Sequence, residues 1–240
     1  MIRFLPRIYQ DLGLKANFSA LSSLSYKLKS FSENLSSSNN KFPNRIQKFN
    51  GQKLFAVCAE YPDIEEFSNT FKLKDTFATW LNVTVLHMWI TLVRLRLDGD
   101  GVKACKNAMI YVMWEDLTQR MKSMGYRKNN HSRVVMSKSI LFGHMTGYDE
   151  AILMNSDPMI AAALWRNIYN HDENASFTDI ENLVDYTRRN LEHVCRIPTE
   201  DIVGKGYITF IGPNEKIQNK TLASQRYQYC VTYPDFLLKP

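Results

Sequence analysis

Residues 76–93 read TFATWLNVTVLHMWITLV, an 18-residue stretch that contains no charged side chain. A stretch of this length raises the question of a membrane-spanning helix. Polar residues, however, recur along one helical face, a pattern typical of a helix packed inside a folded domain. This polar stripe consists of Thr84, His87, Thr91, Arg94 and Asp98. We therefore predict a central core helix, with a membrane span as the lesser alternative.

Helical patterns also flank this stretch on both sides. The clearest covers residues 103–124, where apolar residues recur at spacings of four and three until Gly125 ends the pattern. Other helices are predicted at residues 62–71, 134–145, 159–169 and 178–197, with a short segment at 44–58 docked on the core. The predicted fold class is all-α, with a single compact multi-helix domain over residues 44–200. We expect residues 201–240 to form an extended C-terminal tail, with a short strand or extended stretch at 207–211.

The net charge of +6 lies entirely in the first 50 residues, which contain eight basic and two acidic side chains. Nine serines fall within residues 19–38, and no unbroken apolar segment of a secretory signal is present. A basic, serine-rich and acid-poor leader is typical of a mitochondrial transit peptide. We predict such a leader over residues 1–43, with an ordinary disordered tail as the alternative. The remaining chain has 22 basic and 22 acidic residues, which disfavours a nucleic-acid-binding domain but leaves a local basic patch open.

Motifs for enzymatic chemistry are absent from the sequence. There is no phosphate-binding glycine loop and no nucleophile elbow, and the four cysteines and five histidines lack metal-ligand spacing. We expect neither a cofactor nor a metal. Two acidic motifs, WED at 114–116 and YDE at 148–150, could supply an acid and a base, Glu115 and Glu150. We favour ion pairs between these motifs and Arg94, Arg120 or Arg166, which would fix the packing of the helices.

Five short motifs occur in a fixed order through the central part of the chain. They are DTFATW (75–80), LHMW (86–89), MWED (113–116) followed by Arg120, GYDE (147–150) and AAALWR (161–166). In this order they resemble the ubiquinol–cytochrome c chaperone family. The resemblance covers roughly residues 62–196 and includes neither the leader nor the C-terminal tail.

This resemblance implies a non-catalytic assembly factor for mitochondrial respiratory complex III, on the matrix side of the inner membrane. The implied client is newly synthesised cytochrome b, and the implied partners are a small second assembly factor and the mitochondrial ribosome. No DNA partner is implied, and direct contact with the membrane stays open. Our hypothesis for the partner-binding surface is the set of residues that cluster in the last two motifs, Tyr148, Asp149, Glu150, Trp165 and Arg166. Two alternatives are a hydrolase that uses Glu115 and Glu150, and a ribosome- or RNA-binding module, which would need a coherent basic face on residues 51–240.

Overall fold

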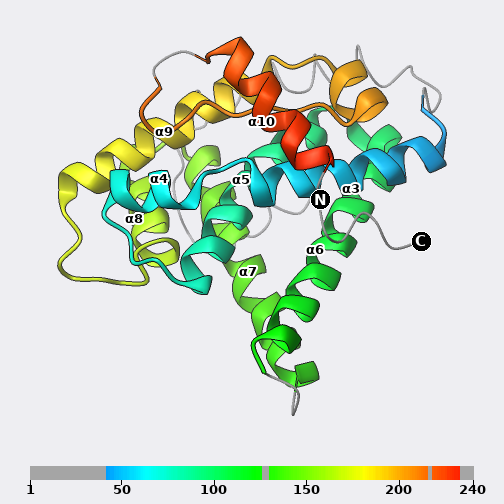
Figure 1. Ribbon diagram of the computed structural model, residues 1–240. Helices are drawn as coiled ribbons and strands as arrows, with labels where there is room; N and C mark the ends of the chain where they lie inside the picture. The colour runs from blue at the N-terminus through cyan, green and yellow to red at the C-terminus, as the bar shows by residue number, and fades with distance from the viewer. Residues whose placement is uncertain (1–41, 126–129, 216–217, 233–240) are drawn as a thin grey trace, which may run out of the picture.

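The charge-free stretch forms α5 (Phe77–Leu97), the helix around which the other helices are arranged (Figure 1). The computed structural model describes residues 42–125, 130–215 and 218–232, so the predicted leader lies outside the described residues except for Phe42 and Pro43. Within these ranges the chain is helical and contains no strand, which confirms the predicted all-α class. The helices that precede α5 are α3 (Asn44–Glu60) and α4 (Ile64–Phe71). Those that follow it are η1 (Gly99–Val102), α6 (Lys103–Ser123), α7 (Asn130–Leu153), α8 (Asp157–Asn167), α9 (Phe177–Cys195), the π-helical turn η2 (Glu200–Lys205) and α10 (Lys220–Thr232).

Local sequence signals explain where several of these helices begin. Thr76 caps α5, because its hydroxyl accepts the backbone N–H of Thr79 at 3.2 Å. Asp63 caps α4 in the same way through the N–H of Glu66. The side chain of Ser156 caps α8, so that Pro158 occupies the first turn, where its missing N–H has no consequence.

The polar stripe of α5 is buried, as predicted, and all of its side chains except that of Thr84 hydrogen-bond inside the protein. His87 is fully buried, and its Nδ1 lies 2.8 Å from the carbonyl oxygen of Val83. Because that oxygen can only accept, Nδ1 carries the proton and Nε2 accepts from the hydroxyl of Tyr186 at 2.7 Å. The hydroxyl of Thr91 donates its hydrogen to the carbonyl oxygen of His87. In the contact between Thr91 and Cys58, the thiol of Cys58 must therefore be the donor and the hydroxyl oxygen of Thr91 the acceptor. The stripe therefore joins α5 to α3 and α9.

Burial makes His87 sensitive to acid. Desolvation lowers its pKa from 6.5 to about 4, although the hydrogen bond to Val83 acts in the opposite direction. In the unfolded chain the imidazole of His87 is protonated near pH 6.5, whereas in the folded protein it is protonated only near pH 4. The stabilisation is therefore complete above pH 6.5 and is lost as the pH falls towards 4.

We expect the free energy of unfolding to fall by up to about 3 kcal/mol over that interval because of this one group. Denaturant titrations at several pH values, compared between the wild type and His87→Gln, measure the effect. Carboxylate titration is common to both proteins, so the difference isolates the imidazole. Parallel pH profiles for the two proteins would contradict the assignment.

The C-terminal end of α5 holds a buried ion pair. Arg94 and Asp98 have side chains only 6% and 5% exposed, and Nη1 of Arg94 donates to Asp98 at 2.8 Å. The guanidinium also donates to the carbonyl oxygen of Ile197 from Nε and Nη2, and to the hydroxyl of Thr199 at 2.9 Å. The Thr199 hydroxyl in turn donates to Asp98 at 2.7 Å. This cluster ties α5 to the chain that follows α9.

Residues 44–58, expected as a short docked segment, instead belong to the 17-residue helix α3. The helix buries polar as well as apolar side chains, which obscures its amphipathic pattern. Gln47 donates to the carbonyl oxygen of Gly101 at 2.8 Å, and Asn50 donates to that of Val203 at 2.8 Å. These hydrogen bonds join α3 to η1 and η2, and α3 also packs along α6.

The expected extended tail is partly helical, because its described residues include α10. The side chain of Asn219 accepts the first free N–H groups of this helix, from Thr221 and Leu222. Its buried side chains, at spacings of four and three, are Ala223, Tyr227 and Cys230. They turn one face of α10 towards α3 (Figure 1).

The stretch at residues 207–211 is neither helix nor strand, and it has no partner strand in the described chain. A side-chain amide takes the place of that strand: Asn190 accepts the N–H of Ile211 at 2.8 Å and donates to its carbonyl oxygen at 3.2 Å. The hydroxyl of Tyr61 donates to the Phe210 carbonyl at 3.0 Å. Hydrogen bonding from α9 and from the end of α3 thus satisfies backbone groups that a sheet would otherwise pair.

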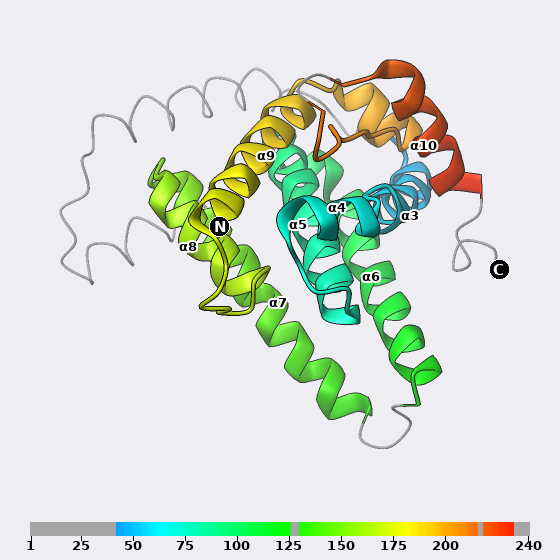
Figure 2. The same ribbon diagram turned by 60° about the vertical axis from the view of Figure 1, so that its left-hand side comes forward.

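Helices α6 and α7 extend beyond the others, and the ends at Ser123 and Asn130 project as an arm (Figure 2). Between the two helices an apolar contact joins Trp114 and Phe142, whose ring centroids are 6.2 Å apart. The part of the chain that the structure describes contains no helix that is long and apolar enough to span a membrane.

Candidate functional site

The five residues of the partner-binding hypothesis lie close together, on the last turns of α7 and on α8. Tyr148 does not belong to the surface, because it is only 1% exposed and packs against Trp89 with ring centroids 5.0 Å apart. Burial raises the pKa of its hydroxyl well above the ordinary value. Tyr148 therefore lies in the core beneath the candidate site, where a partner protein cannot contact it.

Asp149 and Trp165 are half-buried and already have partners within the protein. Asp149 accepts the indole N–H of Trp89 at 2.7 Å and pairs with Arg96 at 2.8 Å. The indole N–H of Trp165 donates to the carbonyl oxygen of Asp172 at 2.9 Å. Ion pairing was the favoured interpretation of the acidic motifs, but the arginine that pairs with Asp149 is Arg96 and none of those predicted. Both side chains orient α7 and α8 on the core.

Glu150 and Arg166 are exposed, and neither forms an ion pair within the described residues. Arg166 reaches across to α7, since a Cβ built on Gly147 would lie 3.3 Å from its Nη2. This contact joins the outer sides of the two helices into one surface. We call it the α7–α8 face and define it by Gly143, Gly147 and Glu150 of α7, Met154 of the turn that follows, and Met159, Ala162 and Arg166 of α8.

The α7–α8 face is composed mainly of small residues and methionines. A Cβ added at Gly143 would meet nothing within 4 Å, so the backbone of α7 is open to a close approach there. Met154 and Met159 are 38% and 37% exposed beside the turn that joins the helices. Methionine adapts its shape to different apolar partners, and small residues let another helix approach closely. Both properties suit a helical, apolar ligand.

The predicted pairing of the MWED motif is confirmed. Asp116 is buried and accepts from Nε of Arg120 at 2.9 Å, while Nη2 of Arg120 donates to Glu60 at 2.8 Å. The same guanidinium lies 4.3 Å above the ring of Trp80. This motif therefore fixes α6 against α3 and α5.

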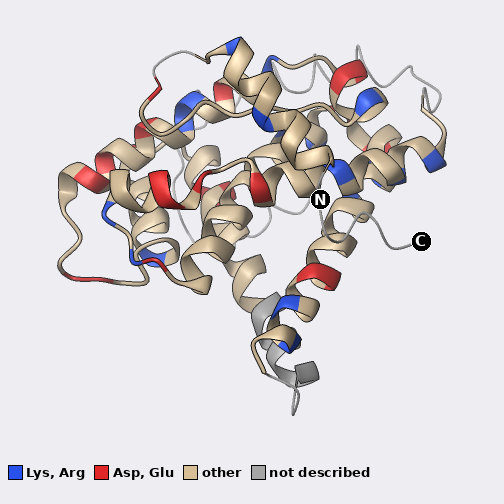
Figure 3. Ribbon diagram, viewed as in Figure 1, with Lys and Arg blue, Asp and Glu red and all other residues tan. Residues whose placement is uncertain are grey.

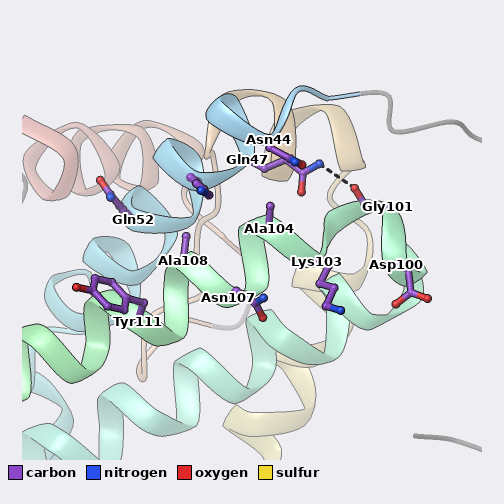
Figure 4. Close-up of a pocket in the computed structure, with 11 residues that line it drawn as sticks. Asn44, Gln47, Gln52, Asp100, Gly101, Lys103, Ala104, Asn107, Ala108 and Tyr111 are labelled. Atoms are coloured by element: carbon purple, nitrogen blue, oxygen red, sulfur yellow. Dashed lines mark hydrogen bonds between the residues drawn. The ribbon is translucent and has the colours of Figure 1, made fainter.

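A groove lies elsewhere, between α3 and the start of α6 (Figure 4). It has a volume of about 660 Å³ and contains neither Glu115 nor Glu150, the carboxylates of the hydrolase alternative. Gln47 crosses one end of it to bind Gly101 (Figure 4). Over residues 42–125, 130–215 and 218–232, no three His, Cys, Asp or Glu side chains gather as metal ligands would. The groove offers polar contacts without an evident acid–base pair.

Comparison with known proteins identifies a matching family. The profile of the family described as ubiquinol-cytochrome C chaperone matches residues 69–210, which is more than half of the chain and includes all five hypothesised site residues. The chain belongs to this family. The ubiquinol-cytochrome C chaperone family is, by its name, a family of chaperones and not of enzymes, in agreement with the prediction of a non-catalytic protein.

Three relatives illustrate the range of the ubiquinol-cytochrome C chaperone family. Ubiquinol-cytochrome-c reductase complex assembly factor 1 from Xenopus laevis is 33% identical over 159 residues, covering 66% of this chain and 78% of the relative. Its human counterpart is 32% identical over 162 residues, covering 66% and 52%. Protein CBP3, mitochondrial, from Saccharomyces cerevisiae is 26% identical over 187 residues, covering 71% and 55%. The matched region thus spans about half the length of the human and yeast relatives.

The fold has a counterpart among solved structures. The crystal structure of the Cbp3 homolog from Brucella abortus matches with a TM-score of 0.61 and 18% identity, over 72% of this chain and 94% of that chain. At this identity the likeness concerns the fold alone.

The predicted site residues lie in one region of the structure, but sequence reasoning missed much of the surface that is exposed there. Gly143, Met154 and Met159 were not among the predicted site residues. Along α7 and into the turn that follows it, the spacing of Gly143, Gly147, Glu150 and Met154 is four, three and four, which could have indicated a shared face. Whether that face points to solvent depends on how α8 packs, which periodicity does not specify.

Proposed function

We propose that this protein is a mitochondrial chaperone that assists the assembly of ubiquinol–cytochrome c reductase, respiratory complex III. Membership of the ubiquinol-cytochrome C chaperone family carries the proposal, since relatives from human and Xenopus laevis are named as assembly factors of that complex. The name of the yeast relative supports a mitochondrial location. We place the protein on the matrix side of the inner membrane. Its action is binding, without a chemical step.

The proposed client is newly synthesised cytochrome b, and the proposed binding site is the α7–α8 face. Helices of a membrane protein pack through small residues, and Gly143, Gly147 and Ala162 offer such a contact. Met154 and Met159 would cover apolar client surface, while Glu150 and Arg166 would bind polar groups at its edge. Tyr148, Asp149 and Trp165 would act as positioning residues beneath this face. A small second assembly factor and the mitochondrial ribosome are further proposed partners.

A bulky residue at Gly143 tests the site. Gly143→Leu places a side chain where a Cβ meets nothing within 4 Å, so the fold is expected to tolerate it and to gain roughly 0.5–1 kcal/mol from helix propensity. Client binding is expected to weaken by about tenfold or more, equivalent to about 1.4 kcal/mol, because the close approach is blocked. Recovery of labelled cytochrome b with the tagged protein, after labelling of mitochondrial translation, measures the binding.

The matched control is Ser224→Leu, which changes another exposed helical position, on α10. Both variants should accumulate to wild-type levels, and only Gly143→Leu should recover less cytochrome b. Equal recovery by the two variants would exclude the α7–α8 face as the client site. Depletion of the protein tests the function itself: complex III is expected to fall, and normal complex III in its absence would refute the assembly role.

A further inference from the structure

The groove between α3 and α6 is walled by one row of side chains from each helix (Figure 4). The two rows are Asn44, Lys48 and Gln52 on α3, and Lys103, Asn107 and Tyr111 on α6. Residues four apart lie on the same side of a helix, so each row extends for about 12 Å along its helix. Each of these side chains can donate a hydrogen bond. The groove therefore suits an elongated ligand that is rich in hydrogen-bond acceptors.

The two rows keep their amide donors free of internal partners. The side-chain amides of Asn44, Gln52 and Asn107 form no hydrogen bond with a described residue. Among the residues that line the groove only Asp100 is acidic, and it precedes Lys103 by three residues. A ligand in the groove therefore meets mainly available donors and one carboxylate at one end.

The surface around the groove is positively charged, although the chain beyond residue 50 is neutral as a whole. Residues 44–59 and 99–114 cover α3 except Glu60, η1 and the first three turns of α6. They contain one acidic side chain, Asp100, and five basic ones, Arg45, Lys48, Lys53, Lys103 and Lys106. None of the five forms an ion pair with a described residue. Blue positions follow α3 from its start at the right of Figure 3, so the field around the groove attracts anions.

An exposed aromatic ring lies at the opposite end of the groove from Asp100 (Figure 4). Tyr111 is 62% exposed, whereas the ring of Phe49 on α3 has the ammonium of Lys53 4.8 Å from its centroid. Unpaired nucleobases stack on exposed aromatic rings, and lysines beside them bind the phosphates. A lipid bilayer, by contrast, is bound through exposed apolar side chains and gains little from amides inside a groove. The lining therefore favours a single-stranded nucleic acid over a membrane.

We propose that the α3–α6 groove binds single-stranded RNA. Lys48 and Lys103 would bind phosphates, the ring of Tyr111 would stack on a base, and the amides would donate to sugar hydroxyls and base edges. Stacked nucleotides rise about 3.4 Å each, so rows of about 12 Å would span three or four of them. The choice of RNA rests on the proposed function, in which the mitochondrial ribosome is a partner.

Fluorescence anisotropy of a labelled single-stranded RNA of about ten nucleotides, titrated with the full chain, tests this site. If Arg45, Lys48 and Lys103 each neutralise a phosphate, the logarithm of the binding constant should fall against that of the salt concentration with a slope of about −2. Lys48→Gln should weaken binding about fivefold at about 0.1 M salt and make the slope shallower by about 0.7. Tyr111→Ala should weaken binding about tenfold without changing the slope, because stacking involves no charge, and Tyr111→Phe should retain it.

Two variants away from the groove serve as controls, Lys220→Gln on α10 and Phe177→Ala at the exposed start of α9. Wild-type binding by both supports the proposal. Absence of RNA binding, or equal losses in the control variants, would overturn it.

Two competing ligands complete the test. Displacement of the RNA by polyglutamate as readily as by unlabelled RNA would contradict the proposal, because the groove would then attract any polyanion. Binding to cardiolipin-containing vesicles that needs Phe49 but not Tyr111 would assign the surface to a membrane instead. The assay contains no cytochrome b, so failure here leaves the assembly role untouched, and normal complex III after depletion would leave RNA binding untouched.

Discussion

Gly51→Ala is expected to lower the free energy of unfolding by about 3 kcal/mol, a large part of the stability of a typical domain. Helices α3 and α6 cross at this glycine, and a Cβ there would lie 2.4 Å from the carbonyl oxygen of Cys105 and 3.0 Å from the Cβ of Ala108. The carbonyl oxygen of Cys105 is a backbone atom and the Cβ of Ala108 is bonded directly to the backbone, so neither can rotate away from the added methyl group. The two helices must therefore move apart. The gain in helix propensity, about 1 kcal/mol, does not offset that separation.

The same substitution at Gly143 is the matched control. Gly143 lies inside α7, and a Cβ added there would meet nothing within 4 Å. Because alanine has a higher helix propensity than glycine, Gly143→Ala should raise the free energy of unfolding by up to about 1 kcal/mol. Urea titrations followed by far-ultraviolet circular dichroism measure both variants. Opposite signs for one substitution at two helical glycines are the expected result, and a stabilised Gly51→Ala would show that the α3–α6 crossing is looser than the structure indicates.

Arg94→Met should lower the free energy of unfolding by about 3–5 kcal/mol, the usual effect of breaking a buried ion pair from one side. The change leaves the Asp98 carboxylate buried without its cation and removes both donors from the carbonyl oxygen of Ile197. Methionine fills much of the volume of the arginine side chain, so the variant leaves only a small cavity. The loss of the charge and of the hydrogen bonds therefore accounts for most of the expected change in the free energy of unfolding. Denaturant titration of the purified variant gives the value.

Arg196→Met provides the comparison, since Arg196 pairs with Glu192 at the surface with a side chain 76% exposed. Exposed pairs contribute about 0–1 kcal/mol, so this variant should be close to wild type. Adding Asp98→Asn to Arg94→Met should recover part of the loss, because the buried charge is removed. No recovery in the double variant would mean that the Ile197 and Thr199 contacts carry the stability and that the ion pair does not.

The central helices were predictable because their side-chain chemistry is local. The polar stripe of α5 pointed to a core helix, and the four-residue spacing of Asp116 and Arg120 pointed to their pair. The motifs around Tyr148 and Trp165 marked the region that contains the α7–α8 face. In each case residues within one or two turns of each other determine the outcome.

Features that depend on distant partners were not predictable. Helix α3 buries Gln47 and Asn50 because their hydrogen-bond acceptors come from Gly101 and Val203, far along the sequence. The acidic motif at Asp149 pairs with Arg96, and the sequence alone could not choose between this residue and Arg94 two positions earlier. The exposure of the candidate residues also depends on distant partners. Tyr148 was predicted to lie on the surface, but it is buried because it packs against Trp89 of α5.

The position of α3 has a consequence for the order of events during synthesis. This first described helix packs against α6, η2 and α10, so its full set of neighbours exists only once the chain beyond residue 220 is present. Until then Leu54, Phe55 and Cys58, fully enclosed in the finished protein, have no lasting cover. Contacts between such distant parts of a chain form late. The protein that we propose as a chaperone therefore exposes apolar side chains of its own during synthesis, until its C-terminal helix covers them.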